Sequence, residues 1–286
     1  TIQAVAGSPE RLDTIIERLK QQSLGLQKQR DDLLEAAGLL EIYRDDGHVC
    51  KRCEDTGYIG STKCECFQKL LREAAFDALG ASHPQDCRFS NFSLDYYSPQ
   101  PLANGVVPRQ RMAQVKNFCS DYARDFFVER HSFSKAQSSP SLLFLGNTGL
   151  GKTHLSLAIA GQVINKGYGV IYGSAQNLLA KLEKEKFSFN NTEDQPQSYL
   201  SLVLECDLLI LDDLGTEFLS QFVTAMLYNI INTRLLEGRP TIISTNLSFQ
   251  EISKRYTDRL TSRLFGGYMH FEFLGRDIRI QSKIMG

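Results

Sequence analysis

The chain lacks both a long hydrophobic run and an excess of charge of either sign. No apolar stretch reaches the roughly 20 residues that cross a bilayer, and the first residues show no signal-peptide pattern. We therefore expect no membrane partner. The 32 lysines and arginines nearly balance the 33 aspartates and glutamates. A chain so close to neutral is not coated in positive charge, so we expect any contact with nucleic acid at a local patch.

Cysteine is sparse except in one place. Four of the seven cysteines lie between residues 50 and 66, as Cys50-x2-Cys53 and Cys64-x-Cys66. A close pair on each side of a loop suits a structural, tetrahedral Zn²⁺ site, because each pair spans one edge of the tetrahedron. His48 is an alternative ligand in place of Cys64 or Cys66, and two disulfides or unligated thiols are the other interpretations. The clustering favours a reduced compartment, and we expect a cytoplasmic protein.

What the chain does have is a globular composition, with 42% hydrophobic residues in 286. This length allows one large core and a smaller module. The pattern from Ser8 to about Tyr43 predicts two helices, which either pack on each other or the next module, or form a hairpin whose apolar stripe awaits a partner. We expect a helical, zinc-binding and partner-docking domain over 1–81, a linker over 82–108 and an ATPase domain over 109–286.

Strands and helices alternate in the last of these domains, as a central parallel sheet requires. The middle strands are apolar from end to end, which is typical of strands buried on both faces. Helices are expected near Arg109–Arg130 and after Lys152, Ser174, Glu217 and Ser248. The predicted strands are Leu142–Leu145, Val170–Tyr172, Leu208–Leu211, Thr241–Ser244 and Tyr268–Phe273.

A glycine-rich turn joins the first predicted strand to the helix that follows. It fits the phosphate-binding pattern G-x-x-x-x-G-K-[ST] completely. Glycines let backbone N–H groups point at the phosphates, and the helix adds its positive end. Lys152 is expected to reach the β- and γ-phosphates, and the Thr153 hydroxyl to hold Mg²⁺. The residues of this loop are Gly146, Asn147, Thr148, Gly149, Leu150, Gly151, Lys152 and Thr153.

Polar residues close two of the later strands. Asp212 and Asp213 follow four apolar residues, at the end of the strand where ligands bind in open α/β sheets. Asp212 is expected to bind Mg²⁺ and Asp213 to orient or deprotonate the attacking water. Two solvated turn carboxylates are the alternative, but that does not explain an apolar strand that ends in a pair of acids. Asn246 closes "TIISTN", where its amide is expected to sense the γ-phosphate. No N-K-x-D guanine signature appears, so ATP is preferred over GTP.

This order of strands, phosphate loop, acid pair and asparagine resembles the AAA+ ATPases. The stretch "SKRYTDRLTSRLFGG" resembles the helix that carries an arginine finger in that class. The resemblance implies that Arg263, or else Arg259, acts on the nucleotide of a neighbouring subunit; a surface arginine on an amphipathic helix is the alternative. Arg279 in "LGRDIRIQ" is then expected to be a second sensing arginine.

"CKRCEDTGYIG", "FSNFSLDYYS", the phosphate loop and "LLILDDLGTE" together resemble the bacterial helicase-loader ATPases of the DnaC/DnaI type, from about His48 onward. The resemblance implies an N-terminal module that binds the hexameric replicative helicase. It also implies an ATPase domain that self-associates, touches single-stranded DNA and switches slowly with ATP. Asp213 replaces the glutamate of strong AAA+ hydrolases, which suits a switch. The chain ends soon after Arg279, so we expect no C-terminal lid.

The run "AQNLLAKLEKEKFSFN" is a candidate contact for single-stranded DNA. Its lysines lie beside aromatic residues, which suits a groove that tracks the backbone and stacks bases. Interleaved Glu183 and Glu185 equally describe a solvated helix face. Three rival functions are a transposition accessory ATPase of the IstB type, a small-molecule kinase and a zinc-dependent adaptor. The lysines are Lys181, Lys184 and Lys186, and the aromatic residues are Phe187 and Phe189.

Overall fold

The computed structural model describes residues 21, 25–26, 28–38, 49–60, 62–70, 87–129, 138–187 and 198–285. The chain divides into two compact units, Thr1–Phe67 and Gln68–Gly286. Residue 81, the expected end of the first domain, lies outside the described residues, so the three predicted domains stay a prediction. Within the part of the chain that is described, no helix combines the length and the hydropathy needed to cross a membrane.

The described residues of the first unit include helical segments and a small hairpin. Residues 28–36 are helical, and Gly38 has a φ of +68° at the end of this helix, as its place in the sequence indicated. Most of the remaining predicted helical region, including Ser8, lies outside the described residues. The hairpin pairs β1 (Tyr58–Ile59) with β2 (Thr62–Lys63) in antiparallel fashion.

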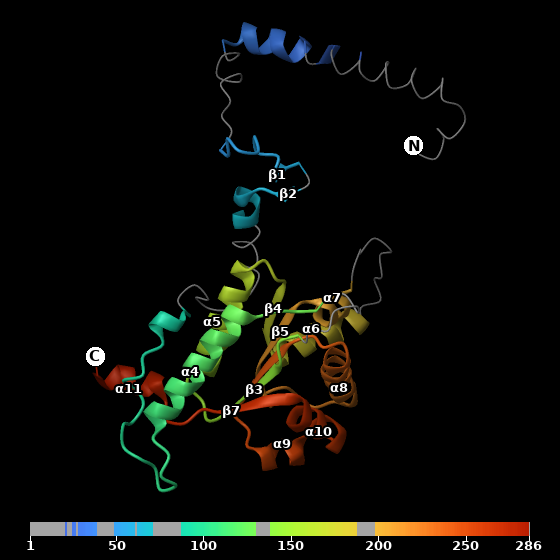
Figure 1. Ribbon diagram of the computed structural model, residues 1–286. Helices are drawn as coiled ribbons and strands as arrows, with labels where there is room; N and C mark the ends of the chain where they lie inside the picture. The colour runs from blue at the N-terminus through green and yellow to red at the C-terminus, as the bar shows by residue number, and fades with distance from the viewer. Residues whose placement is uncertain are drawn as a thin grey trace. The chain divides into compact units, whose positions relative to one another are not determined.

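The second unit is built on a five-stranded parallel sheet with the order β4-β5-β6-β3-β7 (Figure 1). All five predicted strands are present, which confirms the predicted fold class. Each differs from its expected bounds by one to three residues. The strands are β3 (Ser141–Leu145), β4 (Val170–Ser174), β5 (Leu208–Leu214), β6 (Thr241–Thr245) and β7 (Tyr268–Glu272).

Helices connect these strands and cover both faces of the sheet (Figure 1). The helix expected to reach Arg130 ends at Asp125, because Phe126 turns into extended backbone and is buried. The helix expected after Ser248 is two helices, since Tyr256 is extended and the Thr257 hydroxyl caps a new helix. The helical segments are η3 (Phe89–Asn91), α4 (Pro108–Asp125), α5 (Lys152–Asn165), α6 (Ala175–Phe187), α7 (Tyr199–Glu205), α8 (Gln221–Leu236), α9 (Phe249–Arg255), α10 (Asp258–Gly267) and α11 (Ile278–Met285).

Alternation along the strands creates two cores, one on each face of the sheet. In β5, Leu208 and Ile210 pack in the first core, which α4 and α5 cover. Leu209 and Leu211 pack in the second core, against α6, α8 and α10. Successive side chains of a strand point to opposite faces, so every second residue enters the same core. This explains why the strands are apolar from end to end.

Residues 87–107, here called the strap, belong to the second unit and pack into its first core, although most of them form no helix or strand. Phe92 and Tyr97 are buried in the first core. The Tyr97 hydroxyl donates to the carbonyl oxygen of Leu150 at 2.9 Å. The Lys116 amine donates to the carbonyl oxygen of Phe92 at 3.0 Å. A segment that the sequence indicates is a linker therefore holds fixed contacts with the phosphate-binding loop.

Candidate functional site

The phosphate-binding loop connects β3 to α5, as the sequence predicted. Gly151 has a φ of +84°, and a Cβ atom there would lie 2.7 Å from the Phe92 ring. Only glycine meets both demands, for a left-handed backbone and for close approach of the strap. Gly149 has a φ of +75°, and a Cβ atom there would collide with the Asp277 carboxylate. Both glycines are therefore fixed by contacts that lie far away in the sequence.

Lys152 is the first residue of α5 and is buried within the loop. Its amine donates to the carbonyl oxygens of Gly146 at 2.6 Å and Asn147 at 2.8 Å, and to Oδ1 of Asn246 at 2.7 Å. Burial lowers the pKa of Lys152, while the charges of Asp213 and Asp212 oppose that shift. The loop, the acid pair and the asparagine, widely separated in sequence, thus meet at one amine.

Asp212 is buried at the carboxyl end of β5, and three hydroxyl groups hold its carboxylate. Thr153 Oγ1 donates to Oδ2 at 2.8 Å, and the Tyr172 hydroxyl donates to the same oxygen at 2.9 Å. Ser244 Oγ donates to Oδ1. The two residues expected to bind magnesium, Thr153 and Asp212, are therefore direct neighbours.

Asp213 lines a cavity of about 330 Å³ together with Lys152, Asn246 and Arg279. Burial raises the pKa of Asp213, as does the negative charge of Asp212, whereas Lys152, Arg279 and a hydrogen bond with Asn246 lower it. A carboxylate with a raised pKa, facing a cavity beside a lysine, has the environment of a group that handles a proton. A solvated turn carboxylate does not match these contacts.

The strap forms the other wall of this cavity. Asn91, Phe92, Ser93 and Tyr96 line it, together with the phosphate loop. The His154 ring packs edge-on against Phe92 with 5.5 Å between ring centroids. Polar and aromatic side chains of the strap thus lie in the same cavity as the phosphate loop.

The three predicted arginines lie in different surroundings. Arg279, on α11, lines the cavity. Arg263 and Arg259 are exposed on α10 and are absent from the described lining of that cavity. Arg263 Nε donates to Oδ1 of Asn232 at 2.8 Å. Neither Arg259 nor Arg263 therefore lines the described cavity of its own chain. An arginine that acts on the nucleotide of a neighbouring subunit is expected to lie away from its own cavity in this way.

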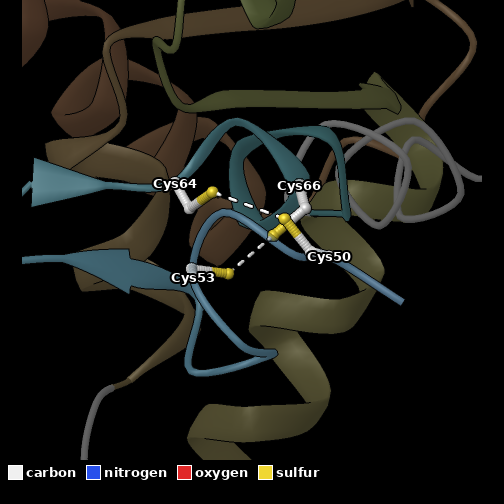
Figure 2. A group of neighbouring side chains, drawn as sticks. All are labelled: Cys50, Cys53, Cys64 and Cys66. Carbon is white, nitrogen blue, oxygen red and sulfur yellow. Dashed lines mark hydrogen bonds between the residues drawn. The ribbon is translucent and has the colours of Figure 1, made fainter. Parts of the chain in front are cut away.

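The four clustered cysteines converge, and all four Sγ atoms lie within 4.8 Å of one another (Figure 2). The distance between Cys50 Sγ and Cys64 Sγ is 3.8 Å, and between Cys53 Sγ and Cys66 Sγ it is 3.3 Å. These separations are far longer than an S–S bond. Backbone N–H groups of Arg52 and Cys53 lower the pKa of Cys50 to about 7.

Nothing joins any of the seven cysteines, all within the described residues, in a disulfide. The disulfide interpretation is therefore wrong. His48, the alternative ligand, lies outside the described residues. The Asp55 carboxylate accepts from the backbone N–H of Cys50 at 2.8 Å and of Val49 at 3.0 Å, which closes the turn that presents the first cysteine pair.

The candidate DNA-binding lysines contact aromatic rings of this chain. Lys181 Nζ lies 3.9 Å from the ring centroid of Tyr199, and Lys186 Nζ lies 5.0 Å from that of Phe222. Glu185 accepts from the backbone N–H of Tyr199 at 2.7 Å. Part of the basic and aromatic pattern therefore joins α6 to α7 and α8. Phe189 lies outside the described residues.

Sequence reasoning missed several residues of the site. Tyr172 and Ser244 contact the acid pair from neighbouring strands, and neither belongs to a recognisable motif. Glu217 is buried; its carboxylate accepts from the backbone N–H of Gly215 at 2.8 Å and from the Tyr256 hydroxyl at 2.5 Å. Glu217 thus ties the loop after the acid pair to the turn between α9 and α10. The only sequence signal for Glu217 was its place at the end of "DDLGTE", just after the acid pair.

Curated relatives align with about half of the chain. The replicative helicase loader DnaC of Escherichia coli (strain K12) is 27% identical over 124 residues, which are 43% of this chain and 49% of DnaC. An insertion sequence IS5376 putative ATP-binding protein of Geobacillus stearothermophilus is 28% identical over 148 residues, which are 50% of this chain and 57% of that protein. The chain thus spans about half the length of the curated relatives it matches.

The fold and the family follow from two further comparisons. A replication initiator DnaA bound to AMPPCP and single-stranded DNA superposes with a TM-score of 0.50 at 22% identity, covering 70% of this chain and 55% of that chain. This likeness shows the AAA+ fold. The sequence profile described as "IstB-like ATP binding protein" matches residues 118–271, just over half of the chain. With its phosphate loop, acid pair and sheet lying inside that match, the chain belongs to the family of IstB-like ATP-binding proteins.

Proposed function

We propose that the protein binds ATP in the cavity at the carboxyl edge of its sheet and hydrolyses it slowly. The observation that carries this proposal is the meeting of Lys152, Asp213 and Asn246 around one cavity. Lys152 stabilises charge on the transferring phosphoryl group. Asp213 takes a proton from, or orients, the attacking water. The Asn246 amide contacts both Lys152 and Asp213, and so holds the water near the γ-phosphate.

The donor set beside the loop fits Mg²⁺. Thr153 offers a hydroxyl oxygen and Asp212 a carboxylate oxygen, only 2.8 Å apart, and oxygen ligands in small number are what magnesium takes beside a nucleotide. A bound ion would supply positive charge that offsets the negative charge of the phosphates. Arg279 faces the same cavity, where its guanidinium is proposed to sense the bound nucleotide.

The cysteine cluster is proposed to hold structural Zn²⁺. Four thiolates around one point are the ligand set of a tetrahedral structural zinc site, and the four Sγ atoms all lie within 4.8 Å of one another. Cys50, Cys53, Cys64 and Cys66 supply four thiolates, and the ion would hold the hairpin and the turn before it together.

The output of the ATPase is proposed to be the loading of a hexameric replicative helicase onto single-stranded DNA. Support comes from the similarity to DnaC, which is a replicative helicase loader, and from the cysteine module that precedes the ATPase. We expect the module over 1–81 to dock the helicase, and the ATPase domain to self-associate and contact DNA. ATP holds the assembly, and hydrolysis releases it.

Native mass measurement tests this output. The protein is mixed with the hexameric replicative helicase of its host, with and without ATP. A defined complex that is lost when residues 8–81 are deleted supports the loader function and locates the docking module. Absence of a complex in every nucleotide state contradicts the loader function and leaves the ATP site untouched.

The second candidate function is a transposition accessory ATPase, which the family and the similarity to an insertion-sequence ATP-binding protein favour. Such a protein delivers a transposase and needs the same ATP site. The discriminating experiment is the same mass measurement with a transposase and double-stranded DNA in place of the helicase.

A further inference from the structure

Strand β5 is irregular where it reaches the ATP site. Its pairing with β6 is regular as far as Leu211 and resumes at Leu214. Two residues of β5, Asp212 and Asp213, therefore stand opposite the single residue Ser244 of β6, which is a β-bulge. Asp213 has a φ of +53°, a left-handed backbone that is unfavourable for a residue other than glycine.

The bulge explains how two consecutive carboxylates reach one site. Residues 208–211 alternate regularly between the two cores, and Asp212 continues this alternation on the side of α5, beside Thr153. A regular strand would then turn Asp213 toward the opposite face. Instead Asp213 faces the nucleotide cavity beside Asn246. The left-handed backbone of Asp213 turns its side chain to the same face of the sheet as Asp212.

Ser244 makes one hydrogen bond to each member of the acid pair. Its hydroxyl donates to Oδ1 of Asp212. Ser244 Oγ also accepts from the backbone N–H of Asp213 at 2.9 Å, an amide placed where the regular pairing of the two strands is interrupted. Ser244 is fully buried, so water does not replace its hydroxyl without rearrangement. One side chain thus orients the first carboxylate and stabilises the backbone that presents the second.

We propose that Ser244 is a positioning residue of the ATP site, which holds the bulge and so directs both acids at the nucleotide. This inference rests on the proposed ATPase function. Ser244 is not among the described residues that line the cavity, so it acts through Asp212 and Asp213. Without its hydroxyl, the partly buried amide of Asp213 loses this acceptor, and the left-handed conformation loses a stabilising contact.

Ser244→Ala and Ser141→Ala form a matched pair for the test. Ser141 is also a buried serine on the sheet, and its hydroxyl accepts from the backbone N–H of Thr241 at 3.0 Å. It lies at the start of β3, away from the acid pair, so it reproduces the loss of a hydroxyl-to-amide bond alone. Ser244→Thr, which keeps the hydroxyl, is the rescue variant.

Two measurements are made on the full chain. The first is the affinity for AMPPCP with Mg²⁺ and with EDTA; the ratio is the gain due to the ion. Ser244→Ala is expected to lose about tenfold or more of this gain, equal to about 1.4 kcal/mol, while Ser141→Ala and Ser244→Thr keep it. The second is hydrogen exchange of a peptide spanning residues 208–216, which is expected to quicken in Ser244→Ala alone.

The proposal is overturned if Ser244→Ala keeps the wild-type gain or the wild-type exchange, or if Ser141→Ala loses the gain equally. A wild-type protein that binds AMPPCP but never hydrolyses ATP contradicts the proposed ATPase function. The gain in affinity with Mg²⁺ and the hydrogen exchange still test the role of Ser244 in that case. If the wild-type protein binds no nucleotide, exchange at residues 208–216 decides alone.

Discussion

At the scale of single residues, Lys152 and Asp213 have separable roles. Lys152→Ala removes an amine that lies inside the phosphate loop, and we expect ATP affinity to fall at least about 10-fold because a charge-assisted hydrogen bond is lost. Asp213→Ala leaves that amine in place, so we expect ATP to bind while hydrolysis falls about 10²–10⁴-fold. Nucleotide titration and phosphate release measure the two effects.

The control for these variants is Asp121→Asn, which changes an exposed carboxylate on α4. It is expected to retain both binding and hydrolysis. Persistent hydrolysis in Lys152→Ala and Asp213→Ala alike would contradict the assignment of the site.

Arg234 is fully buried on α8 and stabilises the fold through backbone acceptors. We expect Arg234→Met to lower the free energy of unfolding by about 3 kcal/mol or more, because several buried carbonyl oxygens lose a charged donor. Arg239→Met, which removes a partly exposed arginine that also contacts a carbonyl oxygen, is expected to cost less than about 1 kcal/mol. Urea denaturation compares them. The acceptors of Arg234 are the carbonyl oxygens of Val203, Leu204, Cys206 and Pro240 and the hydroxyl of Thr241.

An equal loss in the two arginine variants would contradict the role given to Arg234. No pattern in the sequence indicates that Arg234 is buried, since an arginine within a helix is expected at the surface. Its partners lie on α7, at the C-terminal end of α7 and at the start of β6, and only the fold brings them together.

At the scale of elements, the strands were the predictable part. Runs such as Leu208–Leu211 are apolar and are followed by acids, a pattern that periodicity and position explain without a structure. The continuation of β5 to Leu214 was not predictable, because it depends on a bulge opposite β6. The packing of the strap on the phosphate loop was not predictable either. Tyr97 and Leu150 are 53 residues apart in sequence, and no local sequence pattern indicates their contact.

The cysteine module is an element whose stability is expected to depend on its metal. Cys53→Ser is expected to lose one equivalent of zinc, and the hairpin with it, because so small a module has little core of its own. Metal analysis by mass spectrometry and limited proteolysis measure the two losses. Cys87→Ser, which lies outside the cluster, is the control and keeps the metal. Zinc retained at one equivalent in Cys53→Ser would contradict this ligand set.

At the scale of the whole molecule, the exposed arginines on α10 predict a site shared between subunits. Arg263→Ala and Asp213→Ala are each expected to be inactive alone, yet a 1:1 mixture is expected to recover about one quarter of the wild-type rate, because about one contact in four pairs an intact acid with an intact arginine. Phosphate release across a series of mixing ratios measures the recovery.

Arg259→Ala in place of Arg263→Ala identifies which arginine acts. If neither mixture exceeds its inactive parents, α10 does not complete a neighbouring site. The sequence placed both arginines on one helix, but it could not choose between them, since that choice depends on the surface of a second subunit.

The strap has a consequence for chemical control of this protein. Part of the lining of the nucleotide cavity comes from Asn91, Phe92 and Tyr96, which precede the ATPase sheet in the chain, whereas Lys152 and Asp213 come from α5 and β5. Trimming Tyr96 would open a recess without touching the catalytic edge. An ATP analogue with an enlarged base would then bind the Tyr96 variant selectively in a mixture with other ATPases. Adding the analogue would set the time at which the variant becomes active.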